Sequence, residues 1–287
     1  MKVQQAKQCI ACDSTQLRSS PAILMPFVSH RALGWAPALI DESWGLRSIS
    51  NGHAYALCLS VYCPNCELLF SDIRFDDQQM ASLYSDYRGE AYTSLRDYYE
   101  PGYASRNLGL SRPLPYLSKS EEYILRYGTS PLSVLDWGGD VGVNTLFRHS
   151  ALAVHVFDIS EKDTIPGVFK VSRVDDLNKR YDLICCANVL EHLPDPVSTV
   201  KLIMRFMDEK TLLFVEVPFE DVMRNAYNFP ERHKKHWHEH INFFSGLGLR
   251  GMLSICGLDV KEVRVLETKN DGDQAYVLQA ICSLTQS

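Results

Sequence analysis

Long apolar runs are missing from this sequence of 287 residues. The longest apolar stretch near its start, "PAILMPFV" (Pro21 to Val28), contains two prolines and is far too short to cross a bilayer. The first residues, "MKVQQAKQCIACD", lack the apolar segment that follows the lysines of a secretory signal. We therefore expect a cytoplasmic protein without a membrane partner.

Positively charged residues are also few, since the sequence has 29 lysines and arginines and 35 aspartates and glutamates. The formal net charge is −6. Nucleic acids and anionic lipids both need a dense basic surface, so this balance argues against a nucleic-acid partner. Neutral or cationic partners fit it better.

Cysteine is too scarce for a disulfide scaffold, and its count of nine is odd. Four of the nine form two pairs, "CIAC" (Cys9 and Cys12) and "CPNC" (Cys63 and Cys66). Two Cys-x-x-Cys pairs can supply four thiolates to a structural zinc ion, with unpaired buried thiols or a redox pair as the alternatives. The other five sit mostly among apolar residues and are expected to be buried: Cys58, Cys185, Cys186, Cys256 and Cys282.

No internal repeat or low-complexity tract divides the chain. Residues 1–75 show short apolar runs broken by Pro, Gly, Ser and Asn, which predicts a small zinc-binding domain with a poor core that metal binding would stabilise. Residues 76–117 predict a connector that is helical at "DDQQMASLYSDYR" and then rich in tyrosine. Its arginines, Arg96, Arg106 and Arg112, are expected to line a site.

Residues 118–287 alternate apolar strands with helices. Continuous apolar strands between helices indicate an α/β fold with a mostly parallel sheet covered on both faces. The last two strands are joined by "TKNDGDQ", whose Asn270-Asp271-Gly272 is a hairpin signal. We therefore expect the sheet to end in an antiparallel pair.

The strongest sign of a ligand is the turn after the first of these strands, "VLDWGGDVGVNTLF" (Val134 to Phe147). Its glycines let the backbone approach a ligand, and a helix predicted after them would present free N–H groups to an anion. Asp158 ends the next strand, where a carboxylate can accept hydrogen bonds from both hydroxyls of a ribose. A later strand ends at Asn188, and Glu191 and His192 follow it.

These motifs, "VLDWGGDVG", "VFDIS" and "YDLICCANVLEHLPDP", resemble in order and spacing the class I S-adenosylmethionine-dependent methyltransferases. The resemblance covers about residues 118–287 and implies a Rossmann-like sheet and S-adenosylmethionine as cofactor. It places the methionine end at the turn from Gly138 to Gly142, the ribose at Asp158 and the adenine at Val174 to Asp176. Asn188 and His192 would flank the sulfonium. The cofactor-binding residues implied in full are Asp136, Gly138, Gly139, Asp140, Gly142, Asp158, Ile159, Val174, Asp175, Asn188 and His192.

One position departs from the G-x-G-x-G pattern of that family, because its middle glycine is Asp140 here. Aspartate tolerates a positive φ better than most residues, so we expect the turn to be kept. Its carboxylate can meet the methionine ammonium, but it would repel the carboxylate beside it. We therefore expect cofactor binding to be retained and weakened.

The first half of the chain has a relative too. A four-cysteine domain ahead of a class I methyltransferase, with "VYCPNCELLFSD" and "LYSDYRGEAY", resembles the sugar C-methyltransferases that act on nucleotide-linked keto-deoxysugars. Those enzymes carry a Y-H-E-H segment before "FFS", and "WHEHINFFS" (Trp237 to Ser245) stands at that place here. The resemblance implies a sugar or nucleotide-sugar substrate. It also implies that His240 with Glu239, or alternatively His238, is the general base near the methyl group.

Trp237 replaces the tyrosine of that segment. Because the family uses this phenol on the acceptor, methylation of a sugar oxygen and methylation of a carbon both stay open, and the indole can instead stack on a sugar face. His233 and His236, next to Lys234 and Lys235, predict a solvated basic stretch or contacts to a nucleotide diphosphate. A second zinc site is not expected here, since the helical HExxH pattern is absent.

Two other functions remain open on the sequence. A zinc-containing RNA methyltransferase shares the plan of a metal site with a Rossmann-like sheet, although the acidic balance argues against it. An inactive methyltransferase-like binding protein is the second alternative, because Asp140 and Trp237 depart from the family patterns.

Overall fold

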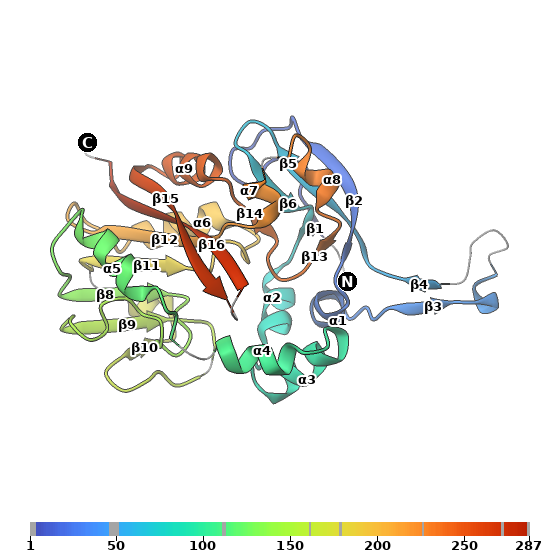
Figure 1. Cartoon of the computed structure of the whole chain (residues 1–287), viewed down its shortest axis with the longest axis horizontal. Coiled ribbons are helices and arrows are strands. Elements are labelled where there is room, and N and C mark those ends of the chain that lie inside the picture. Colours follow the sequence, from blue (N-terminus) through green and yellow to red (C-terminus); the bar gives the residue numbers. More distant parts are fainter. Residues whose placement is uncertain are drawn as a thin grey trace.

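The computed structural model describes residues 4–45, 52–110, 113–160, 162–177, 180–225, 227–270 and 273–285. Within them the chain forms two larger sheets and two short two-stranded ones. Figure 1 shows the largest sheet, built from the C-terminal part of the chain, on the left and the second sheet on the right. No helix among these residues is both long and apolar enough to span a bilayer.

The largest sheet has the strand order β10-β9-β8-β11-β12-β16-β15. Neighbours from β10 to β12 are parallel, whereas β16 is antiparallel to both β12 and β15. The predicted α/β sheet with an antiparallel last pair is confirmed, although residues 271–272 of the predicted turn lie outside the described residues. Its strands are β8 (Ser133–Trp137), β9 (Ala153–Phe157), β10 (Phe169–Val171), β11 (Leu183–Ala187), β12 (Leu212–Pro218), β15 (Leu258–Asn270) and β16 (Asp273–Leu284).

Helices cover both faces of this sheet, as its apolar strands require. Successive residues of β8 show the two faces, because side chains alternate along a strand. Val134 packs in one apolar cluster with helix α5 (Leu117–Leu125), and Leu135 packs in another with α6 (Pro196–Met204) and α9 (Gly246–Ile255). The core of the sheet therefore lies on both sides of its central strands.

The helix predicted after the glycine turn is absent, because residues 138–150 form turns and bends. Phe147 has a φ of 56°, which a right-handed helix does not allow. Its backbone N–H donates to Glu121 Oε1 at 2.6 Å, and Thr145 Oγ1 donates to Asp136 Oδ2 at 2.6 Å. Side chains thus hold this segment, and a helix N-terminus does not contribute to the turn.

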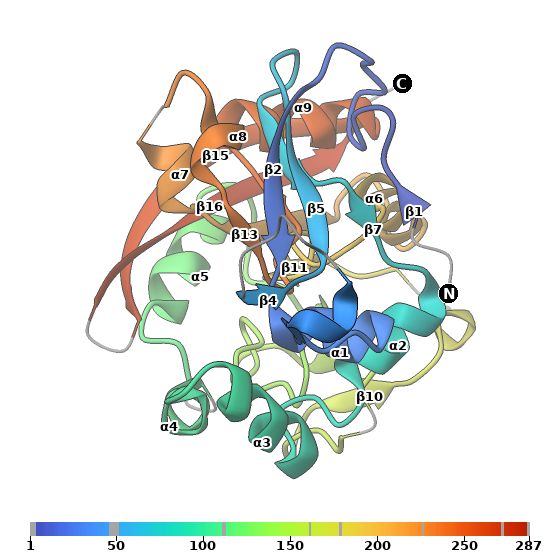
Figure 2. The same ribbon diagram turned by 90° about the vertical axis from the view of Figure 1, so that its right-hand side faces the viewer.

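The second sheet joins distant parts of the chain, in the order β13-β2-β5-β6-β14. Figure 2 shows β2 and β5, its central antiparallel pair, side by side. Residues 1–75 supply three of these strands, and residues 236–243 supply the other two. The predicted domain boundaries at residues 75 and 117 stay a prediction. The strands are β2 (Arg18–Leu24), β5 (Leu57–Cys63), β6 (Leu68–Ser71), β13 (His236–Trp237) and β14 (Asn242–Phe243).

Residues 1–75 are packed better than their sequence predicts. A buried apolar cluster includes Leu24, Phe27 and Leu69, together with Trp237 and Phe243 from the later segment. The poor core was predicted from residues 1–75 alone, whereas the folded cluster also draws side chains from far along the chain. Apolar burial therefore contributes to the stability of this region besides any metal.

Residues 76–117 contain helices α2 (Asp77–Tyr84), α3 (Glu90–Tyr99) and α4 (Tyr103–Leu110). Asp76 begins α2 with a capping box, since its carboxylate accepts from Gln79 N while its own N–H donates to the Gln79 side chain. The helix predicted here is confirmed. The remaining elements are β1 (Gln4–Gln5), α1 (Pro26–Leu33), β3 (Ala38–Ile40), η1 (Glu42–Trp44), β4 (Gly52–Ala54), β7 (Ile73–Arg74), η2 (Val174–Asp176), α7 (Asp221–Arg224) and α8 (Pro230–His233).

Candidate active site

A cavity of about 1460 Å³ opens at the carboxyl ends of β8, β9, β11 and β12. Helices α2 to α4 and the segment 236–240 form its other walls, and the ends of β15 and β16 reach it as well. Ligands of open α/β sheets bind at this edge. Arg96 and Arg106 line the cavity as predicted, while Arg112 lies outside the described residues.

The glycine turn after β8 forms one wall of the cavity. Gly138 and Gly142 have φ values of 83° and 84°, which favour glycine. A Cβ atom at Gly139 would lie 2.6 Å from Asp136 Oδ2, so the backbone passes this carboxylate too closely for another residue. Burial raises the pKa of Asp136 to about 6, although the hydrogen bond from Thr145 opposes the shift.

Asp140 keeps the turn, as its sequence position predicts, with a φ of 50°. Its backbone N–H donates to Asp158 Oδ2 at 2.9 Å, so the turn is tied to the end of β9. Its carboxylate lies 3.2 Å from Lys162 Nζ. This lysine, which sequence reasoning missed, offsets the negative charge that was expected to weaken cofactor binding.

The predicted ribose residue, Asp158, lines the cavity, and its Oδ1 accepts from Ser160 N at 2.7 Å. Ile159 lines the cavity with an exposed side chain. Val174 and Asp175 do not line it: Val174 packs against the main core, and Asp175 lies on the surface 3.8 Å from Arg173. The structure therefore brings none of the residues predicted for the adenine, Val174 to Asp176, to the cavity.

Asn188 lies at the end of β11 with a φ of 55° and lines the cavity. Its amide donates to Glu216 Oε1 at 3.1 Å, and the Tyr116 hydroxyl donates to the same oxygen at 2.8 Å. Gln279 Nε2 donates to Glu216 Oε2 at 2.6 Å. This buried network orients Asn188, and sequence reasoning missed it because its members come from four distant segments.

Three histidines that line the cavity gather in one cluster. The ring centroids of His192 and His240 are 4.6 Å apart, and those of His238 and His240 are 4.7 Å apart. The backbone N–H of His240 donates to His238 Nδ1 at 3.1 Å, and His240 Nδ1 lies 3.3 Å from Glu220 Oε1. The residues predicted for the sulfonium side and for the acceptor side thus meet in one cluster.

Glu239 is held by an arginine rather than free to take a proton. Its Oε1 lies 2.5 Å from Arg96 Nη1, which comes from α3. Burial would raise the pKa of Glu239, but the His238 ring and the Arg96 guanidinium outweigh it and lower this pKa to about 2. Arg96 also donates to the Tyr92 hydroxyl at 3.1 Å. Glu239 therefore anchors the segment as a paired anion.

The other ionisable groups of the cluster are shifted in opposite directions. Burial lowers the pKa of His192 to about 3 and that of His238 well below its usual value. For His240, burial also lowers the pKa, but Glu220 and Glu191 outweigh it, and the pKa rises. Burial raises the pKa of Glu191 to about 7. Groups perturbed in this way gather at functional sites.

Trp237 does not face the cavity, so the predicted stacking on a sugar is wrong. Its side chain is fully buried, and its Nε1 donates to Ser60 Oγ at 2.8 Å. Side chains alternate along a strand, and β13 turns His236 and Trp237 to opposite sides. His236 and His238 line the cavity, whereas the indole fills the core under the second sheet.

The solvated basic stretch is confirmed only in part. Lys234 is buried, with its Nζ 4.4 Å from the centre of the Phe243 ring, and burial lowers its pKa to about 8. His233 is exposed and its ring stacks on Tyr227 at 3.9 Å. Lys235 and His236 are exposed, and His236 reaches the cavity. The stretch thus divides between the core, the surface and the site.

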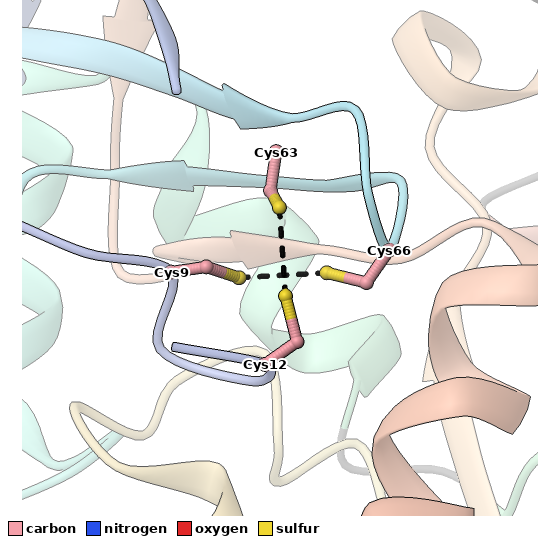
Figure 3. Close-up of side chains that lie close together, drawn as sticks. All are labelled: Cys9, Cys12, Cys63 and Cys66. Carbon is pink, nitrogen blue, oxygen red and sulfur yellow. Dashed lines mark hydrogen bonds between the residues drawn. The ribbon is translucent and has the colours of Figure 1, made fainter. Parts of the chain in front are cut away.

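The four paired cysteines come together, and Figure 3 shows their sulfur atoms pointing toward one another. The sulfurs of Cys9 and Cys66 are 3.4 Å apart, those of Cys12 and Cys63 are 3.6 Å apart, and all four lie within 4.8 Å of one another. Contact with Cys66 lowers the pKa of the Cys9 thiol to about 5. The other five cysteines are buried, as predicted.

Comparison with known proteins identifies the family to which the chain is similar. The model of the family described as Methyltransferase domain matches residues 110–263, more than half of the chain. No curated protein matches the chain.

Solved structures of similar shape include three methyltransferases. The glycopeptide N-methyltransferase MtfA, complexed with S-adenosylmethionine, is 11% identical, with 61% of this chain and 96% of that chain covered and a TM-score of 0.47. The 1,6-didemethyltoxoflavin N1-methyltransferase of Burkholderia thailandensis is 16% identical, with 67% and 88% covered and a TM-score of 0.45. An S-adenosylmethionine-dependent methyltransferase of Methanosarcina mazei is 16% identical, with 57% and 98% covered and a TM-score of 0.42.

The glycine turn, the acidic residue after β9 and the histidine cluster lie within the matched residues. The family match covers every parallel strand of the largest sheet. The chain therefore belongs to the Methyltransferase domain family and is an S-adenosylmethionine-dependent methyltransferase.

Proposed function

We propose that this enzyme methylates a sugar, either nucleotide-linked or part of a glycan precursor. The observation that carries the proposal is that the glycine turn and the histidine cluster share one cavity of about 1460 Å³. Pockets for a single drug-sized ligand measure roughly 300–1,000 Å³, so this cavity has room for a cofactor and an acceptor together. Its polar, aromatic and arginine-bearing walls suit a hydroxylated acceptor.

The residues of the turn fit the cofactor. The lack of a side chain at Gly139 lets the turn pass close to the Asp136 carboxylate at the rim of the cavity, and Asp158 is placed to accept from ribose hydroxyls. We propose Asp136, the turn from Gly138 to Gly142, and Asp158 for the methionine and ribose parts, with Asn188 and His192 beside the sulfonium and Ile159 beside the adenine. The cofactor supplies a methyl group on a sulfonium cation.

Hydrogen bonds support the roles that we propose for the histidine cluster. If His240 Nδ1–H donates to Glu220, its Nε2 keeps a lone pair that can take a proton from the acceptor. His238 Nδ1 accepts from a backbone N–H, so neutral His238 carries its proton on Nε2 and donates to an acceptor oxygen. We propose His240 as the base, His238 as the donor and Glu239 as the anion that Arg96 holds in place. The same removal of one proton would activate either a hydroxyl oxygen or a carbon beside a ketone for methylation.

The acceptor class is tested by methyl transfer from radiolabelled S-adenosylmethionine to a panel of nucleotide sugars, with transfer RNA and total RNA as controls. We expect label on at least one sugar and none on RNA. Mass spectrometry and NMR of the product then show whether oxygen or carbon carries the methyl group. Label on RNA alone would overturn the sugar assignment in favour of an RNA methyltransferase, and binding of S-adenosylhomocysteine without any transfer would favour an inactive binding protein.

Asp140→Gly tests how the departure from the glycine pattern affects the cofactor. Because Lys162 offsets the charge of Asp140, native protein should bind S-adenosylhomocysteine, and the variant should change its affinity by less than about tenfold, or 1.4 kcal/mol. Isothermal titration calorimetry measures both affinities. Native protein that gives no binding heat while Asp140→Gly binds would contradict this expectation and show that Asp140 prevents cofactor binding.

We also propose that Cys9, Cys12, Cys63 and Cys66 hold a structural zinc ion. Tetrahedral zinc with bonds of about 2.3 Å to sulfur places its ligands ~3.8 Å apart, close to the two sulfur distances of 3.4 and 3.6 Å. The contact between Cys9 and Cys66 lowers the pKa of the Cys9 thiol and raises that of Cys66, so a metal ion would bind one thiolate readily and would have to displace the proton of the other thiol. Zinc would contribute folding free energy here and no catalytic step.

A further inference from the structure

Glu191 stands out in the wall of the cavity. Its side chain is 1% exposed, and neither carboxylate oxygen has a hydrogen-bond partner among the described residues. A buried carboxylate without partners is costly, because it loses the hydration it had in water. A group from outside the chain that binds both oxygens would remove this cost.

Two histidines lie beside this carboxylate. His192 Nε2 is 3.7 Å from Glu191 Oε1. One ligand atom from each of Glu191, His192 and His240 lies within 4.8 Å of the other two. Two imidazoles and a carboxylate at such distances need only small side-chain movements to surround one ion.

The hydrogen bonds on the far side of each ring prepare the histidines to bind metal. His192 Nδ1 lies 2.8 Å from the Tyr84 hydroxyl, which can accept or donate, and 3.1 Å from the carbonyl oxygen of Glu239, which can only accept. Both contacts are hydrogen bonds when Nδ1 carries the proton, and this tautomer leaves the lone pair on Nε2. His240 Nδ1 lies 3.3 Å from Glu220 Oε1, which leaves its lone pair on Nε2 in the same way. Metal-binding histidines are oriented by such partners, a carbonyl or a carboxylate on the other nitrogen.

We propose that Glu191, His192 and His240 bind one divalent transition-metal ion. Two histidines and one carboxylate are a donor set used for zinc, iron and related ions, with open positions left for water or substrate. All three residues line the cavity, so these open positions face the acceptor. Two neighbouring oxygens of a sugar are the ligands that would fill them.

The role of the ion rests on the proposed function. A metal lowers the pKa of a bound hydroxyl, so the acceptor proton passes to water. The acceptor oxygen then forms a bond to the methyl carbon while the bond from this carbon to sulfur breaks, and S-adenosylhomocysteine leaves. With the ion bound, the lone pair of His240 holds metal, and the ion activates the acceptor in place of direct proton removal by His240.

Titration of the full-length protein with Mn²⁺, followed through the electron paramagnetic resonance signal of free Mn²⁺, tests the site. Mn²⁺ suits carboxylate ligands, whereas thiolates select zinc, so the cysteine set does not compete. We expect one Mn²⁺ per chain and an affinity lowered by at least about tenfold in both Glu191→Gln and His192→Ala. Glu209→Gln is the matched control, since Glu209 is exposed and does not line the cavity.

Native protein that binds no Mn²⁺, or an affinity that is equal in all four proteins, would overturn the metal site. The sugar panel is run on the same preparations, which separates the two proposals. Sugar methylation by a protein that binds no Mn²⁺ removes the metal site alone. One Mn²⁺ per chain in a protein that methylates no sugar removes the sugar assignment and supports the metal site.

Discussion

Replacement of His240 by alanine is expected to lower turnover by about 10²- to 10⁴-fold, the range that a positioned acid or base contributes. The affinity for S-adenosylhomocysteine should stay nearly unchanged, because the glycine turn and Asp158 follow β8 and β9, whereas His240 belongs to another segment. The same loss is expected whether His240 takes the proton itself or holds a metal ion. Methyl transfer under single-turnover conditions and calorimetric titration of the product cofactor measure the two quantities.

His233→Ala is the matched control for this loss. His233 lies seven residues before His240 at the end of α8, but it is exposed and its ring stacks on Tyr227. It does not line the cavity, so its removal should leave turnover at the native level. Full activity of His240→Ala would remove His240 from the mechanism, and lost cofactor binding in that variant would show that the residue supports the fold instead.

Removal of the proposed zinc ion should cost the protein much of its stability. Loss of a structural metal belongs with the largest single-site effects, so we expect Cys12→Ala to lower the free energy of unfolding on the order of 4 kcal/mol. At roughly 2–4 °C per kcal/mol for chains somewhat shorter than this one, the melting temperature should fall by about 10 °C. Calorimetry and metal analysis by mass spectrometry check the two expectations, with one zinc per native chain.

Cys58→Ala is the control for the zinc prediction, since Cys58 is also a free cysteine but lies outside the sulfur cluster. This variant removes the same sulfur atom and should retain one zinc per chain. Cys58 packs among apolar residues, so Cys58→Ala should lower the free energy of unfolding by less than Cys12→Ala does. Native protein without zinc, or equal melting temperatures for the two variants, would contradict a structural metal.

Local patterns in the sequence were enough to predict the largest sheet. Apolar strands of five to seven residues such as β8, β11 and β12 alternate with helices, and this pattern has few folded solutions. The glycines of the turn and Asp158 could be placed because each follows directly on a strand. The hairpin signal at Asn270 predicted the antiparallel pair, since turn chemistry depends on neighbouring residues only.

Features that depend on distant partners could not be predicted. The capture of Glu239 by Arg96 joins residues of separate segments, and no local pattern indicates it. The orientation of Trp237 depends on β13 pairing with β2 in a register that only the folded sheet sets. The missing helix after β8 has the same cause, because Glu121 from α5 binds the backbone N–H of Phe147.

The second sheet also has a consequence for the folding of the chain during its synthesis on the ribosome. Strands β2, β5 and β6 are synthesised early, whereas β13 and β14 emerge only after most of the largest sheet. Until then both edges of the early strands are unpaired, and open edges invite pairing with other chains. The segment that closes these edges is the one that carries His238 and His240, so the nascent chain loses its exposed edges at the same moment as it gains the two histidines that we propose for catalysis.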